Sequence, residues 1–227
     1  MNRAQAGGAD NGEARQILRR APSPLKADIY LDTQGGTPTV VKDFSRAPRW
    51  LRHILGRLLL GREARCLQTL AGIEGVPAFL ERIGPHAYRM EFVPGDLPSL
   101  AALGADGGRL LAQLAQRVAA LHQRGVTHND LRLKNMLLTP QNQLYLLDFG
   151  AAMHRPASRA FWTLPGHWLF AYLRRTDCAK LARLKHRCGG DLSATERELI
   201  QRTRWARCAT QLWKRRILPL LSHRKRR

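Results

Sequence analysis

Alternating hydrophobic and polar positions mark three short segments near the start of the chain: RQILRR, KADIYL and TVVKDF. This period of two is typical of strands that bury one face. The stretches between them, APSPL and DTQGGTP, are rich in turn-forming residues. We therefore predict three antiparallel strands between residues 15 and 44.

A helical period replaces the alternation in the segment LLLGREARCLQTLAG, which ends at Gly72. The segment AYRMEFVPG then has the character of a strand, stopped by Pro94 and Gly95. We predict one helix followed by one strand, with a hinge at residues 92–95.

The clearest amphipathic helix is GRLLAQLAQRVAALHQRG, in which one stripe is apolar and Gly125 stands where a helix ends; the stripe consists of Leu110, Leu114, Val118 and Leu121. Two short strands are predicted on either side of TPQNQ. Beyond Gly150 the pattern is helical, and Ser193 with Glu196 three positions later forms a capping box.

This order predicts an α+β protein with two lobes: a small antiparallel sheet with one helix, then a mainly helical half. We expect residues 1–14 to be disordered, 15–93 to form the first lobe, 94–213 the second, and 214–227 a basic tail. Ligand clefts tend to lie where two lobes join.

The charge of the chain is unusual: 227 residues carry 38 Lys and Arg against 17 Asp and Glu, a net charge of +21. Such a field favours polyanionic partners.

The four cysteines show no zinc-site spacing, which favours reduced, partly buried thiols. The N-terminus lacks the apolar core of a signal peptide, and no apolar run is long enough to span a bilayer. We expect a cytoplasmic protein.

Two acids and an asparagine stand close together in HNDLRLKN and LLDFG. Phosphoryl transfer from ATP to a hydroxyl needs a carboxylate that orients the attacking oxygen, and oxygen ligands for metal ions. Asp130 is the candidate base. Asn135, five positions later, offers an amide oxygen to Mg²⁺, and Asp148 at the end of an apolar strand offers a carboxylate.

These motifs, in this order, resemble those of the protein kinase superfamily over residues 16–175. The resemblance implies a protein-kinase-like fold with ATP as co-substrate and Mg²⁺ or Mn²⁺ as cofactor. It implies that Lys42 in VVKDF binds the α and β phosphates and that Glu63 in GREARCL pairs with it. In MEFVPG it implies Met90 as gatekeeper and the backbones of Glu91 and Val93 as adenine contacts.

Arg132 and Lys134 are alternatives for contacting the transferred phosphoryl group, with a slight preference for Arg132 because donors two positions after the aspartate are commoner in this superfamily. His128 resembles a histidine that braces the catalytic loop and is not assigned a catalytic role.

Three features depart from ordinary protein kinases. There is no GxGxxG. In its place is the turn APSPL, in which two prolines lack a backbone N–H and Ser23 is the candidate hydrogen-bond donor to a phosphate. Asn129 replaces the arginine that usually receives a phosphorylated activation loop, so activation by phosphorylation is not expected. No APE follows the DFG. In these departures the chain resembles the compact bacterial lipopolysaccharide-kinase and RIO-type branches. The first resemblance implies a sugar hydroxyl as acceptor, and the second implies a serine or threonine of a protein or an ATPase role.

The last third interleaves aromatic and basic residues, as in FWTLPGHWLFAYLRR and WKRRILPLLSHRKRR. This pattern suits an anionic membrane surface, single-stranded RNA, or a helical core with a solvated tail, with nucleic acid less favoured than membrane. Two functions therefore stay open. One is a kinase, cytoplasmic or peripheral at the inner membrane. The other is a pseudokinase-like scaffold that binds RNA, lipid or a protein.

Overall fold

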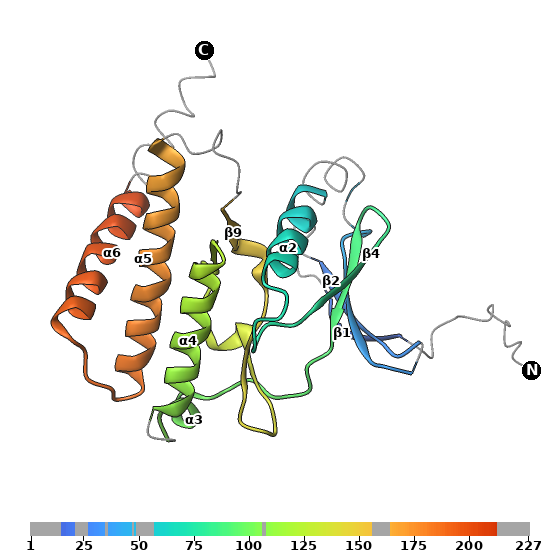
Figure 1. Cartoon of the computed structure of the whole chain (residues 1–227), viewed down its shortest axis with the longest axis horizontal. Helices are drawn as coiled ribbons and strands as arrows, with labels where there is room; N and C mark the ends of the chain where they lie inside the picture. Colours follow the sequence, from blue (N-terminus) through green and yellow to red (C-terminus); the bar gives the residue numbers. More distant parts are fainter. Residues whose placement is uncertain are drawn as a thin grey trace, which may run out of the picture. The chain divides into compact units, whose positions relative to one another are not determined.

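The computed structural model describes residues 15–20, 27–34, 36–46, 48, 57–105, 108–155 and 164–212. The chain divides into two compact units, and Figure 1 shows the elements of each. Unit 1 comprises Met1–Gly72 and Val76–Pro94, and unit 2 comprises Ile73–Gly75 and Gly95–Arg227. The predicted disordered N-terminus and basic tail lie outside the described residues.

Unit 1 is a five-stranded antiparallel sheet in the order β1-β2-β3-β5-β4, with one helix, α2. Its elements are β1 (Arg15–Arg19), β2 (Asp28–Asp32), β3 (Thr39–Asp43), α2 (Arg57–Thr69), β4 (Phe79–Ile83) and β5 (Ala87–Glu91). Helix α2 contacts β4 and β5. Its residues Leu60, Ala64 and Leu67 recur at helical spacing and are all buried, which explains why this segment forms a helix against the sheet.

Unit 2 is mainly helical, with helices α3 (Leu100–Ala105), α4 (Arg109–Gln123), α5 (Leu164–Arg187) and α6 (Ala194–Leu212). Helix α4 packs on α5, and α5 packs on α6 (Figure 1). The four predicted stripe residues of α4 are buried, and Gly125 has the positive φ of a helix end, +72°. The capping box of α6 forms as predicted: the Ser193 N–H donates to Glu196 Oε2 at 2.7 Å, and the Glu196 N–H donates to Ser193 Oγ at 3.2 Å.

Short elements fill the chain between α4 and α5: strands β6 (Val126–Thr127), β7 (Met136–Leu138), β8 (Leu144–Leu146) and β9 (Met153–His154), and the 3₁₀ turns η3 (Leu133–Asn135) and η4 (Phe149–Ala151). Strands β7 and β8 are the predicted pair around TPQNQ. Thus the α+β prediction is confirmed. The prediction of helix throughout the chain beyond Gly150 is wrong at its start, where β9 pairs with β6 before α5 begins.

No helix in the described part of the chain is long and apolar enough to cross a membrane. Of the cysteines whose side chains the structure describes, Cys66 is buried, Cys188 is half-buried and Cys178 is exposed, and all three are free thiols. Burial raises the pKa of the Cys66 thiol to about 12, so this cysteine stays protonated and unreactive.

Candidate active site

Unit 1 holds a buried ion pair between Lys42 and Glu63. Lys42 lies on β3, flanked by Ile29 of β2 and Tyr88 of β5, and Glu63 lies on α2. Lys42 Nζ donates to Glu63 Oε1 at 2.5 Å, and the two side chains are 7% and 5% exposed. A buried ammonium is stable only with such a partner. The structure therefore brings together the two residues that the sequence assigns to phosphate binding, and that role stays a prediction.

The gatekeeper candidate Met90 and the two adenine-contact candidates, Glu91 and Val93, lie at and just after the end of β5. Met90 and Glu91 are half-buried, and Val93 is buried. The Glu91 N–H donates to the Ala78 carbonyl, while the Glu91 carboxylate accepts from the Ala78 N–H, each at 2.9 Å. Because the N–H of Glu91 is already used, any contact of this residue with adenine would use its carbonyl oxygen. Ser23 lies outside the described residues.

In unit 2, the candidate base Asp130 has two neighbours that hold its carboxylate. Asn135 Nδ2 donates to Asp130 Oδ2 at 2.9 Å and to the Asp130 carbonyl at 2.8 Å. Arg132 Nε contacts Asp130 Oδ1 at 2.6 Å. The side chain of Asp130 is 23% exposed, so it is held in one orientation yet stays accessible to a substrate hydroxyl.

Of the two residues predicted to contact the transferred phosphoryl group, Arg132 thus lies next to the candidate base. Its side chain is 62% exposed, which leaves its guanidinium able to bind an anion. Lys134 is exposed and forms no ion pair with the described residues. This geometry fits the slight preference for Arg132, and the choice between the two stays a prediction.

The two candidate metal ligands leave the same end of the β7–β8 hairpin. Met136 pairs with Leu146 in this hairpin, and the Leu147 N–H donates to the Asn135 carbonyl at 2.8 Å. Asn135 therefore lies opposite Leu147, the residue directly before Asp148. Asp148 has a left-handed backbone, with φ of +62°, which an aspartate tolerates better than most residues. The hairpin therefore explains how residues 13 positions apart come close.

The donor set fits a hard cation. Because Asn135 Nδ2 points to Asp130, its Oδ1 is oriented away from that carboxylate and is available as a neutral ligand. Asp148 adds a charged oxygen. The described residues contain no cluster of three or more His, Cys, Asp or Glu that could bind a metal by themselves. Such a sparse set is what Mg²⁺ uses when nucleotide phosphates and water complete its shell.

His128 braces this region, as the sequence suggested. Its Nε2 is 3.0 Å from the Leu147 carbonyl, and the Asp130 N–H donates to its Nδ1 at 3.3 Å. Since a carbonyl only accepts, His128 is the neutral tautomer with its proton on Nε2. Burial lowers the pKa of His128 below its usual value, outweighing the opposing effect of Asp177. The ring also packs on Phe149, with centroids 4.9 Å apart.

Sequence reasoning missed Asp177, which fixes the catalytic loop from α5. Its side chain is fully buried. Asp177 Oδ2 accepts from the His128 N–H and Oδ1 from the Asn129 N–H, both at 2.8 Å, and Oδ2 lies 3.2 Å from His122 Nε2. The available signal was compositional: Asp177 is the one acid in a helix that carries six Lys and Arg.

Asn129, at the position of the missing arginine, links three parts of the site. It has a left-handed backbone, with φ of +64°, which asparagine tolerates. Its Nδ2 donates to Thr127 Oγ1 at 3.1 Å and to the Ala151 carbonyl at 3.0 Å, and Lys180 Nζ donates to its carbonyl. A neutral amide thus joins the catalytic loop to the segment after DFG.

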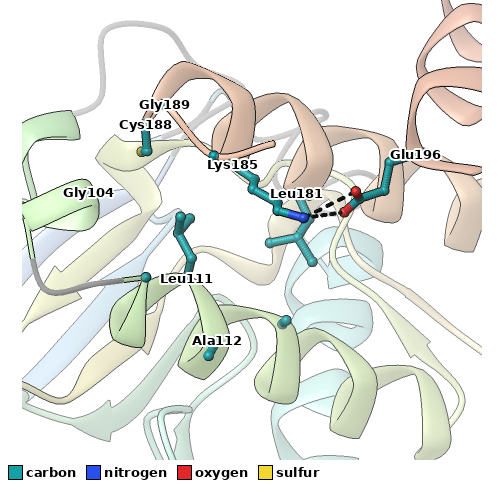
Figure 2. Close-up of a pocket in the computed structure, with 11 residues that line it drawn as sticks. Gly104, Leu111, Ala112, Leu181, Lys185, Cys188, Gly189 and Glu196 are labelled. Carbon is teal, nitrogen blue, oxygen red and sulfur yellow. Dashed lines mark hydrogen bonds and ion pairs between the residues drawn. The ribbon is translucent and has the colours of Figure 1, made fainter. Parts of the chain in front are cut away.

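Unit 2 also contains a cavity of about 540 Å³ away from these residues. Figure 2 shows that α4 residues Leu111 and Ala112 line one side, that Leu181 of α5 lies opposite, and that Lys185 is paired with Glu196. None of the predicted site residues lines this cavity. It is therefore separate from the candidate active site.

Comparisons with known proteins agree with the geometry. Residues 99–164, which include the catalytic loop and DFG, match the lipopolysaccharide kinase (Kdo/WaaP) family. Curated relatives include cyclin-dependent kinase F-1 of Oryza sativa subsp. japonica, 28% identical over 60% of this chain and 30% of its own length. CBL-interacting protein kinase 22 of the same plant is 32% identical over 43% of this chain and 24% of its own.

The human testis-specific serine/threonine-protein kinase 4 is 31% identical over 33% of this chain and 24% of its own length. The aligned segments therefore span less than two thirds of these relatives. Together the matches support a protein-kinase-like superfamily assignment, and confirm the resemblance that the motifs predict.

Proposed function

We propose that this protein is a Mg²⁺-dependent kinase that transfers the γ-phosphate of ATP to a hydroxyl group. The observation that carries the proposal is the Asp130–Asn135 hydrogen bond beside Asp148, in a loop held from below by His128 and Asp177. A pseudokinase-like scaffold has no physical need to keep a base and both metal ligands together. The kinase matches over the same segment support this choice.

In the proposed reaction, the acceptor oxygen bonds to the γ-phosphorus while the bond from that phosphorus to ADP breaks, and Asp130 accepts the proton of the hydroxyl. Asn135 and Arg132 hold the Asp130 carboxylate. Arg132 then binds the non-bridging oxygens of the transferred group. Bound Mg²⁺ would be held by Asn135 and Asp148 and would neutralise phosphate charge. Lys42, aimed by Glu63, would bind the α and β phosphates of the same nucleotide.

For the acceptor, we favour a sugar hydroxyl of a glycolipid such as lipopolysaccharide core. The family match over residues 99–164 supports this class. The lack of an APE motif after Gly150 argues in the same direction, because nothing in the sequence there resembles a peptide-docking segment. A serine or threonine of a protein is the competing acceptor, which the protein-kinase relatives support.

The test is transfer of γ-labelled phosphate from Mg-ATP into separated glycolipid, protein and RNA fractions, with and without EDTA. We expect EDTA-sensitive label in the glycolipid fraction. Label in protein instead would keep the kinase and overturn the glycolipid acceptor. If no fraction is labelled although the protein binds Mg-ATP, the kinase proposal is wrong and the scaffold is the better account.

A further inference from the structure

The N-terminal half of α5 presents a strip of large side chains to solvent. Trp168 is 70% exposed, Leu169 49% and Tyr172 42%. Trp168 and Tyr172 are four positions apart and so lie on one face of the helix. Phe170 is 5% exposed, so the opposite face is packed into unit 2 and the helix is held in place.

Positive charge accompanies these aromatic residues. Arg175 follows Tyr172 by three positions on the same face, and Arg174 is its exposed neighbour. Neither arginine forms an ion pair with any residue that the structure describes. The only acid of α5, Asp177, is buried under the catalytic loop. The solvent-facing formal charge of this helix is therefore positive only. We call Trp168, Leu169, Tyr172 and Arg175 the α5 strip.

We propose that the α5 strip binds the surface of an anionic phospholipid bilayer. Trp and Tyr rings favour the headgroup level of a membrane, a neighbouring Leu reaches the acyl boundary, and Arg binds lipid phosphate. Apolar patches that stay exposed to water promote aggregation, so a patch of this kind indicates a surface that binds a partner. Three apolar anchors on one helix give reversible, salt-sensitive binding rather than permanent insertion.

The place of the α5 strip adds a consequence that rests on the proposed function. Asp177, which holds the backbone of His128 and Asn129, lies nine positions after Trp168 on the same helix. At 1.5 Å per residue this is roughly 13 Å along the axis. A bilayer bound at the strip would therefore be attached to the same helix whose Asp177 holds the catalytic loop, which would keep the proposed kinase site at a membrane that contains its glycolipid acceptor.

The experiment is co-sedimentation of the full chain with vesicles, without nucleotide. One set of vesicles is phosphatidylcholine alone, and the other contains phosphatidylglycerol as well. The variants are Trp168→Ser with Tyr172→Ser, and Arg175→Glu. Arg187→Glu, an equal charge change at the exposed far end of α5, is the matched control. Leu80→Ser on β4, 49% exposed, controls for the loss of an exposed apolar side chain.

We expect binding to the anionic vesicles only, reduced at least about fivefold by Arg175→Glu and by the double aromatic variant but not by either control. The changed side chains are exposed, so thermal melting should be unaltered. Equal binding by all variants would overturn the proposal. It would also be overturned if the strip variants altered dimerisation or RNA binding of the protein and left vesicle binding unchanged. Because no ATP is present, Asp130→Asn should bind vesicles like the wild type, which separates this result from the fate of the kinase proposal.

Discussion

At the scale of single residues, the candidate site depends on charges that are buried in pairs or aimed by neutral partners. Lys42 and Glu63 neutralise each other in unit 1. In unit 2 the amide of Asn135 orients the Asp130 carboxylate, and the neutral imidazole of His128 holds the backbone beside it. The buried carboxylate of Asp177 adds a charged support beneath the same loop.

Lys42 and Glu63 should show strong coupling in stability. Lys42→Met or Glu63→Leu alone leaves the other charge buried without its partner, and should lower the free energy of unfolding by about 3–5 kcal/mol. The double variant should lose much less than the sum of the two. Urea unfolding measures all three. The exposed Arg202–Glu198 pair is the control, and its loss should cost at most about 1 kcal/mol. Additive losses at Lys42 and Glu63 would contradict the buried-pair interpretation.

At the scale of elements, α5 and the β7–β8 hairpin together position the catalytic loop. The hairpin brings Asn135 next to the residue before Asp148, and α5 supplies Asp177 beneath His128 and Asn129. Helix α4 adds His122 to the same acid. The loop is therefore held by three elements, although it contains no regular structure except the short turn η3.

The His122–Asp177 contact should make stability depend on pH. Burial alone would lower the pKa of His122, but the hydrogen bonds and charges of Asp177 and Cys178 raise it above the usual value. A raised folded-state pKa means that protonated His122 stabilises the fold. This contribution is complete below the unfolded-state pKa of about 6.5 and is lost as pH rises through the folded-state pKa.

The free energy of unfolding of the wild type minus that of His122→Gln should therefore be largest at acid pH and shrink as pH increases. Urea titrations of both proteins over this range measure it. The separate titration of His128 is present in both proteins and cancels in the difference. A difference that grows with pH would contradict the assignment of His122 as the protonated partner of Asp177.

At the scale of the whole molecule, the sequence predicts most of the elements from their apolar patterns. Helices α2 and α4 bury residues at a period of 3.6, and strands β1, β2 and β3 could be predicted as short segments between turn-rich stretches. The burial of these strands does not alternate as predicted, because all of β1 is exposed and the middle three residues of β3 are all buried. Strand β4, whose middle three residues are all exposed, was not predicted. Helix α3 has only six residues and contains a glycine, and β6 and β9 have two residues each, too few for any period.

The candidate site divides in the same way. Asp130, Asn135 and Asp148 could be found because they lie in short motifs whose order is informative. Asp177 could not, because its importance comes from contacts with residues 48 and 49 positions earlier. A lone acid in a basic helix indicates a constraint but not its partner. The aromatic and basic composition of the α5 strip could be recognised in the sequence. Which of its side chains face solvent could not, because this depends on Phe170 being the residue packed into unit 2.

The most direct test of the account is the rate of γ-phosphate transfer by Asp130→Asn compared with the wild type, measured together with Mg-ATP affinity. Asp191→Asn, an exposed acid outside the site, is the matched control. If Asp130 is the base, its variant should lose about 10²–10⁴-fold in rate while Mg-ATP affinity and thermal melting stay close to wild type. Transfer by Asp130→Asn at the wild-type rate would contradict the central claim.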